Sequence, residues 1–150
     1  MNQHQPVNII MIEDDDGHAR LIEKNIRRAG ISNDIHHFTD GISALDYLHN
    51  HPSGPTHNGP ALILLDLNLP DMSGTDILVR IKAEDNPLKR TPVVVLTTTD
   101  DKVEIQRCYD LGCNVYITKP VNYETFADAI RQLGLFLSVI QVPDLPEANG

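Results

Sequence analysis

Short apolar runs alternate along the chain with longer segments whose apolar residues recur at helical spacing. The apolar runs predict β-strands at residues 7–12, 34–38, 61–65, 92–96 and 115–117. The run at 61–65 contains only apolar residues, which is typical of a strand buried on both faces of a parallel sheet. The run at 34–38 is more polar, so we expect that strand nearer an edge of the sheet.

The segments between these runs predict helices. Apolar residues share one helical face between residues 19 and 29, and Gly30 follows at a position where glycine often ends a helix. Further helices are predicted at residues 40–48 and 123–140. A helix with Ile77, Leu78 and Ile81 is predicted after a turn that ends at Gly74, and a short one, capped by Asp100 or Asp101, is predicted to run to about residue 111. Because strand and helix alternate through the whole chain, we predict an α/β fold with a doubly wound, five-stranded parallel sheet.

The length of 150 residues is the usual size of one domain. We therefore expect a single domain over residues 1–150, with a core at about 7–138 and no room for a separate output module. Residues 49–60 are rich in Pro, Gly, Asn and His and predict an exposed loop. Residues 141–150 are expected to form a C-terminal tail.

The charge of the chain limits its partners. Acidic residues number 21 and Lys plus Arg 12, which leaves a formal net charge of −9. Such a chain repels phosphate backbones and anionic lipid, so we expect neither nucleic acid nor a membrane as a partner. The two cysteines and the lack of a signal-like or membrane-length apolar run favour a reduced, cytoplasmic protein.

Charged and polar residues stand where the predicted strands end. Glu13 and Asp14 follow the first strand, and Asp66 follows the third. Thr97 ends the fourth strand and Lys119 follows the fifth. In an open parallel sheet these ends meet in one crevice, and carboxylates gathered there favour Mg²⁺, a hard cation that prefers oxygen ligands. A carboxylate beside Mg²⁺ can attack phosphorus and form an aspartyl phosphate.

Several motifs carry a resemblance to a known family. They are Ile12-Glu13-Asp14-Asp15, Leu65-Asp66-Leu67-Asn68-Leu69-Pro70 with Gly74, Val95-Leu96-Thr97-Thr98, and Tyr116-Ile117-Thr118-Lys119-Pro120. In order and spacing they resemble the receiver domain of two-component response regulators over about residues 7–138. The resemblance implies the (βα)5, flavodoxin-like receiver fold. It also implies a signalling protein that accepts a phosphoryl group from a histidine kinase, and no enzyme beyond Mg-dependent self-phosphorylation and self-dephosphorylation.

The resemblance further implies a role for each strand-end residue. Asp66 is the expected phosphoacceptor, and Glu13 and Asp14 form the acidic pocket. The expected Mg²⁺ ligands come from Glu13, Asp14, Asp66 and the backbone carbonyl of Asn68. Lys119 is expected to contact the phosphoryl group.

Two further residues are implied to switch conformation. Thr97 is the expected switch hydroxyl, and Tyr116 is the aromatic residue expected to turn inward on activation. Tyr116 also suits a core position, since an aromatic residue in a final strand commonly packs there.

The subgroup that the chain most resembles is that of the small receivers associated with bacterial phytochrome kinases. Members of that subgroup often dimerise through their C-terminal segments. Apolar residues here continue beyond what one helix face needs, which predicts a homodimer interface at Leu135, Phe136, Val139 and Ile140. The alternative is that residues 142–146 fold back and cover this surface.

Two other functions of this fold class, a hydrolase and a flavin binder, fit the residues of the chain less well. A hydrolase that forms an aspartyl phosphate would need a second acid two residues after the nucleophile, where this chain has Asn68. A flavin binder would need a phosphate loop after the first strand, where Asp15 and Asp16 extend the acidic run. These two acids are expected to cap a helix. Within signalling, both a terminal output and a shuttle to a histidine phosphotransfer protein stay open.

The remaining histidines and cysteines suggest little chemistry. His49, His51 and His57 lie in the predicted loop and are expected to be solvated rather than to bind metal. Cys108 and Cys113 are expected to act as small hydrophobic residues.

Overall fold

A computed structural model gives the fold. It describes residues 7–28, 30–58, 61–119, 122, 124–125, 127–129 and 131–132. Five parallel strands form one sheet in the order β2-β1-β3-β4-β5. The strands are β1 (Asn8–Ile12), β2 (Ile35–Phe38), β3 (Ala61–Leu65), β4 (Val93–Thr97) and β5 (Val115–Thr118). The predicted α/β fold with a five-stranded parallel sheet is confirmed.

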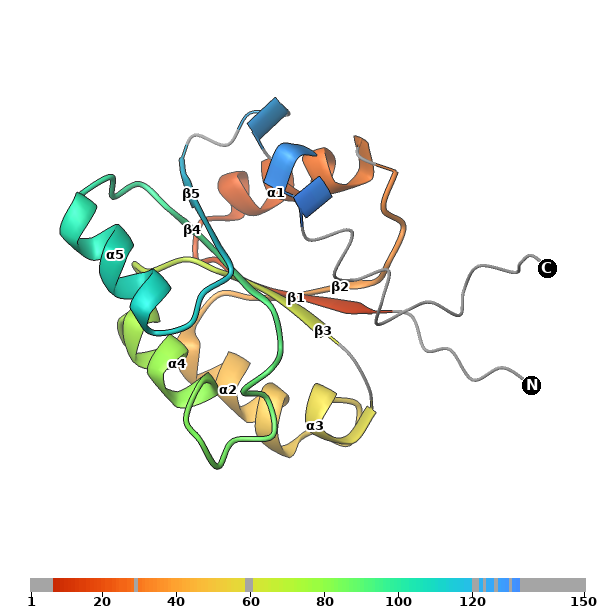
Figure 1. Cartoon of the computed structure of the whole chain (residues 1–150). Helices are drawn as coiled ribbons and strands as arrows, with labels where there is room; N and C mark the ends of the chain where they lie inside the picture. Colours follow the sequence, from red (N-terminus) through yellow and green to blue (C-terminus); the bar gives the residue numbers. More distant parts are fainter. Residues whose placement is uncertain are drawn as a thin grey trace.

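Helices cover both faces of this sheet. The helices are α1 (Asp16–Arg28), α2 (Gly41–Asn50), α3 (Pro55–Asn58), α4 (Gly74–Ile81) and α5 (Lys102–Asp110). Figure 1 shows α1 on one face of the sheet and α2, α4 and α5 on the other. Successive side chains along each strand point to opposite faces of the sheet and therefore pack into two separate hydrophobic cores. Ile10 and Ile12 of β1 pack toward α2 and α4, and Ile9 and Met11 pack toward α1.

The strand burial follows the sequence pattern. Every residue of β3 and β4 is buried, as expected of central strands with helices on both sides. Every residue of β2 is partly or fully exposed, and β2 lies at an edge of the sheet as predicted. Helix α1 is described to Arg28, and Gly30 has a φ of 85°, a conformation that glycine adopts without strain.

The segment expected to be an exposed loop, residues 49–60, is partly helical. Helix α2 continues to Asn50, and the single turn of α3 begins at Pro55. Proline suits the first turn of a helix because its missing N–H has no partner there. Gly54 packs so tightly that a Cβ on it would lie 2.2 Å from the carbonyl oxygen of Tyr47. Close packing against α2 therefore orders part of this segment.

The C-terminal region is described only in part. Residues 124–125, 127–129 and 131–132 are helical, and Ala127 and Ala129 are buried. The predicted interface residues Leu135, Phe136, Val139 and Ile140 lie outside the described residues, as does the tail at 141–150. In the described part of the chain, no helix is both long and apolar enough to cross a membrane.

Candidate functional site

The site lies where the chain leaves β1 and β3 at the carboxyl edge of the sheet. These strands are neighbours, and Ile12 pairs with Leu65 at their ends. The backbone N–H of Asp66 donates to the carbonyl of Ile12 over 3.0 Å. The next residues of the two strands therefore emerge side by side. Strand order reverses here, which is where open α/β sheets form their ligand crevices.

Three carboxylates gather at this edge. Glu13, Asp14 and Asp66 each place a carboxylate oxygen so that the three oxygens lie within 4.8 Å of one another. Glu13 and Asp66 are buried, whereas Asp14 is exposed. They border a hollow of about 200 Å³ lined by Glu13, Asp14, Asp15, His18, Asp66, Asn68, Thr98 and Lys119. An all-oxygen set of anionic donors at an accessible edge fits a hard divalent cation.

Lys119 brings a positive charge to the same hollow. Its Nζ lies 2.5 Å from Oε1 of Glu13 and 3.5 Å from Oδ2 of Asp66. Its side chain is only 6% exposed, so the ion pairs are little screened by solvent. Its backbone N–H donates to the carbonyl of Thr97 over 2.7 Å, which ties the end of β5 to the end of β4. The ammonium thus partly neutralises two buried carboxylates.

The environment of Asp66 favours its protonated form. Burial and the neighbouring charge of Glu13 raise its pKa to about 6 from 3.8. The ammonium of Lys119 and the backbone N–H of Asn68 oppose this rise. The fold therefore holds the ionised form of the Asp66 carboxyl at an energetic cost.

Thr97 reaches the site through Asn68. The Nδ2 of Asn68 lies 3.4 Å from the hydroxyl of Thr97. The backbone N–H of Asn68 donates to Oδ1 of Asp66 over 3.2 Å. Thr97 is fully buried, and Thr98 rather than Thr97 lines the hollow. Asn68 therefore bridges the expected switch hydroxyl and the expected phosphoacceptor.

Tyr116 lies on β5 and packs partly buried against the core. Its hydroxyl donates to the carbonyl of Thr99 over 2.7 Å. Its backbone N–H donates to the hydroxyl of Tyr109 over 3.1 Å, so the same residue contacts α5. Burial raises the pKa of its phenol to about 12. Tyr116 is thus joined to the loop after β4 and not to the acidic hollow.

The loop after Asp66 requires a glycine at its end. A Cβ on Gly74 would lie 2.4 Å from the carbonyl oxygen of Asp66. The N–H of Gly74 donates to the carbonyl of Leu67 over 2.9 Å. Because only a residue without a side chain fits here, Gly74 lets the start of α4 pack directly beneath the expected phosphoacceptor.

Sequence reasoning missed His18. Asp15 accepts a hydrogen bond from the backbone N–H of His18 over 2.9 Å, as expected of a helix cap, and Asp16 begins α1. The imidazole of His18 lies 3.3 Å from Nζ of Lys119 and 3.9 Å from Oε2 of Glu13. The spacing of three residues after a capping acid was the available signal, since it places His18 in the first turn beside the acidic run.

His49, His51 and the two cysteines do not line the acidic hollow. His51 is exposed, as expected, and its ring packs at a tilt against that of Tyr47. His49 is half-buried and bonded to Leu45 and Asn86, so it differs from the expected solvated state. The side chain of His57 lies outside the described residues. The two cysteines, Cys108 and Cys113, are free and buried, in agreement with a packing role.

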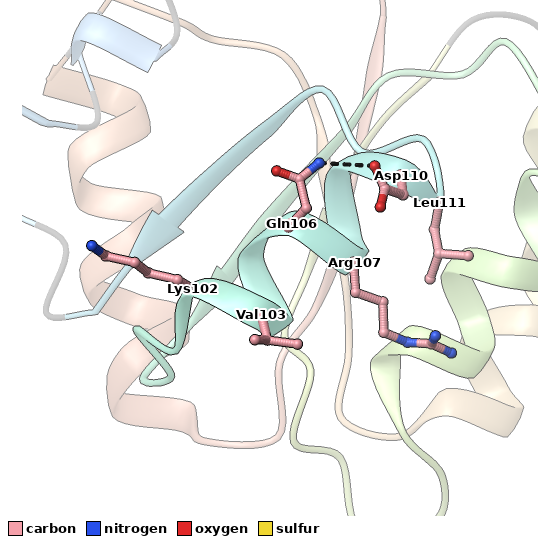
Figure 2. Close-up of a pocket in the computed structure, with 6 residues that line it drawn as sticks. All are labelled: Lys102, Val103, Gln106, Arg107, Asp110 and Leu111. Carbon is pink, nitrogen blue, oxygen red and sulfur yellow. Dashed lines mark hydrogen bonds between the residues drawn. The ribbon is translucent and has the colours of Figure 1, made fainter.

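A second hollow, of about 500 Å³, lies along α5. It is lined by Lys102, Val103, Gln106, Arg107, Asp110 and Leu111 (Figure 2). Val103 is 76% exposed there, and Gln106 donates to Asp110 over 2.8 Å within the same helix. This surface contains none of the acidic side chains of the first hollow.

Comparisons with known proteins agree with this geometry. The family model for the response regulator receiver domain matches residues 9–131. A crystal structure of a response regulator receiver domain from Rhodospirillum rubrum is 68% identical, with a TM-score of 0.73, and the match covers 92% of this chain and 98% of that one.

Two phytochrome-related proteins are also similar. Response regulator Rcp1 from Synechocystis is 34% identical over 140 residues, 92% of this chain and 94% of Rcp1. The crystal structure of its Mn²⁺-bound form has a TM-score of 0.68 and covers 88% of this chain and 94% of that one. The phosphorylated cyanobacterial phytochrome response regulator RcpA is 34% identical, with a TM-score of 0.73 and coverage of 90% and 96%.

The family is one of signalling proteins that work with a histidine kinase. The chain belongs to the response regulator receiver domain family.

Proposed function

We propose that Asp66 accepts a phosphoryl group from the phosphohistidine of a sensor histidine kinase. The observation that carries the proposal is the arrangement of one buried carboxylate among two further carboxylates and one ammonium. Oxygens of Glu13, Asp14 and Asp66 lie within 4.8 Å, and Nζ of Lys119 lies 3.5 Å from Asp66. A buried salt bridge alone would stabilise the fold little, so this arrangement is better explained by chemistry.

The proposed step is an in-line displacement at phosphorus. A carboxylate oxygen of Asp66 attacks the phosphorus, and a new O–P bond forms as the P–N bond of the phosphohistidine breaks. The electron pair of the P–N bond remains on the departing nitrogen, and the imidazole leaves neutral when its other nitrogen carries a proton. Lys119 stabilises the negative charge on the transferred oxygens.

The acidic hollow fits Mg²⁺. Asp14 and Asp66 would hold the ion with the backbone carbonyl of Asn68, and Glu13 would complete the acidic pocket. When bound, the metal neutralises the carboxylates and the incoming phosphoryl oxygens. The Mn²⁺-bound form of Rcp1 supports a divalent cation in a related protein.

Phosphorylation of Asp66 would then change the conformations of Thr97 and Tyr116. A phosphoryl group brings about −1.5 to −2 charges and three acceptor oxygens, which draws a nearby hydroxyl toward it. Thr97 already reaches Asp66 through Asn68. Movement of Thr97 would free space for Tyr116 and alter the face formed by α5 and β5.

The relatives favour a particular partner. Rcp1 and RcpA are response regulators, RcpA of a phytochrome, so we propose a phytochrome kinase as the phosphodonor. We further propose a cytoplasmic receiver that signals by protein contacts as a homodimer, and that binds neither nucleic acid nor membrane. Its self-dephosphorylation would be Mg-dependent, and a terminal output and a phosphate shuttle are equally compatible with the site.

The test is phosphorylation of the wild type and Asp66→Asn by phosphoramidate, whose P–N bond resembles that of phosphohistidine. The wild type should acquire one acid-labile label in the presence of Mg²⁺, and Asp66→Asn should acquire none. Asp71→Asn is the matched control, because Asp71 is a carboxylate on the same loop that instead accepts from the N–H groups of Gly41 and Ile42. Equal labelling of wild type and Asp66→Asn would place the acceptor elsewhere.

A further inference from the structure

His18 occupies a defined position at the edge of the acidic hollow. It lies in the first turn of α1, and its backbone N–H is held by Oδ1 of Asp15 over 2.9 Å. Its side chain lines the hollow and is 48% exposed, whereas those of Glu13 and Lys119 are 2% and 6% exposed. The imidazole therefore stands on the solvent side of the buried ion pair.

The contact between His18 and Lys119 determines the tautomer of the imidazole. Nδ1 of His18 lies 3.3 Å from Nζ of Lys119. A lysine ammonium has three donors and no acceptor, so Nδ1 must accept, and the ring proton must be on Nε2. Nδ1 of His18 thus accepts from an ammonium that otherwise faces the carboxylates of Glu13 and Asp66.

We propose that His18 is a positioning residue that holds the ammonium of Lys119 in place for phosphoryl transfer to Asp66. This inference rests on the proposed function of the site. Glu13 is the nearest partner of the ammonium, at 2.5 Å, and attracts it toward the buried side. The half-exposed imidazole of His18 supplies a second contact, which holds the ammonium at the mouth of the hollow where phosphoryl oxygens would arrive.

Of the contacts that Glu13 and His18 make with the ammonium of Lys119, the one with His18 costs less free energy to break. It is longer than the Glu13 contact, its acceptor is an imidazole nitrogen rather than a carboxylate oxygen, and it is partly open to solvent. When a phosphoryl group arrives, its oxygens take the place of Nδ1 as the acceptor of that N–H. His18 therefore positions Lys119 in the unphosphorylated protein and releases it upon phosphorylation.

Kinetics separate this role from a steric one. Phosphorylation by phosphoramidate should slow about threefold to tenfold in His18→Ala, since a charge-assisted hydrogen bond is lost and the ammonium must be reorganised. His18→Asn should restore most of the rate, because its side-chain oxygen can accept near the position of Nδ1, whereas His18→Phe should not. His51→Ala, which changes a histidine whose ring packs at a tilt against Tyr47, is the control and should match the wild type.

A second measurement reports the contact without phosphorylation. Nitrogen NMR of the imidazole at about pH 8.5 should show His18 as the Nε2–H tautomer. Lys119→Met should convert it to a mixture of tautomers, and a phosphate mimic on Asp66 should do the same in the wild type.

The outcomes distinguish this inference from the proposed function. A mixed tautomer in the wild type, or a rate in His18→Ala equal to that of the wild type, would overturn the positioning role while phosphorylation of Asp66 stands. Equal slowing in His18→Asn and His18→Ala would also overturn it, because the acceptor would then not matter. Absence of any label on wild-type Asp66 would overturn the proposed function instead.

Discussion

The hydroxyl of Tyr116 donates a hydrogen bond to the carbonyl oxygen of Thr99 over 2.7 Å. This bond joins the middle of β5 to the loop between β4 and α5. Thr99 lies two residues after Thr97 in this loop, so the bond lies between the site and α5. In the unphosphorylated protein, the hydroxyl of Tyr116 therefore restrains the loop between β4 and α5.

Replacing Tyr116 with Phe should release that loop. The variant loses one half-buried hydrogen bond, so we expect a loss of about 1 kcal/mol in the free energy of unfolding. Amide hydrogen exchange of the unphosphorylated variant should be faster at residues 98–101 than in the wild type. A phosphate mimic should change exchange from Thr97 to Ile117 in the wild type, and an unchanged pattern there would contradict the switch.

Most of the framework of the site could be predicted from the sequence. The wholly apolar run before Asp66 indicates a central strand, and parallel strands place their carboxyl ends together. The gathering of Glu13, Asp66 and Lys119 follows from that rule alone. The motifs that resemble those of receiver domains then predict phosphoryl transfer as the chemistry of the site.

What the sequence did not indicate depends on tertiary contacts. The turn of α3 is ordered by the packing of Gly54 against the carbonyl of Tyr47, and no periodic pattern encodes such a contact. His18 reaches Lys119 only because Asp15 caps α1 and sets the direction of its first turn. A local pattern could predict the cap, but not the partner of the residue that follows it.

Asp66→Asn should stabilise the metal-free protein near pH 7. The native pKa of Asp66 is about 6 and its ordinary value is 3.8, so between about pH 4 and pH 6 the native state holds more protons than the unfolded state. Stability contributed by this group is therefore present below about pH 4 and falls as the pH rises to 6. The variant removes the ionisation, and we expect a gain of about 1 to 3 kcal/mol at pH 7.

Urea unfolding in the presence of a chelator measures this difference. The gain should shrink at pH 4, where the wild-type carboxyl is largely protonated in the native state. A pH-independent difference between Asp66→Asn and the wild type would show that packing, and not the charge, is responsible.

Dimerisation should depend on the C-terminal apolar residues. The sequence predicts an interface at Leu135, Phe136, Val139 and Ile140. Burial of such side chains contributes about 1.5–3 kcal/mol each before the entropy of association is subtracted. Sedimentation of the unphosphorylated wild type at micromolar concentration should show a dimer, and Phe136→Asp should show a monomer. A wild-type monomer, or a dimeric Phe136→Asp, would leave the tail at residues 142–146 as the better candidate for covering this surface.

Binding of Mg²⁺ should weaken as Asp66 takes up its proton. The ion requires the ionised carboxylate, so affinity should fall when the pH is lowered from 7 through the Asp66 pKa of about 6, and binding should release protons near that pH. Calorimetric titration in buffers of different ionisation enthalpy measures both quantities.

Asp14→Asn should weaken binding strongly at every pH, because it removes an exposed oxygen ligand of the cluster. Asp85→Asn, in the loop before β4 and so at the opposite edge of the sheet, should bind as the wild type does. Unchanged affinity between pH 7 and pH 5 would show that the carboxylate of Asp66 is not a ligand.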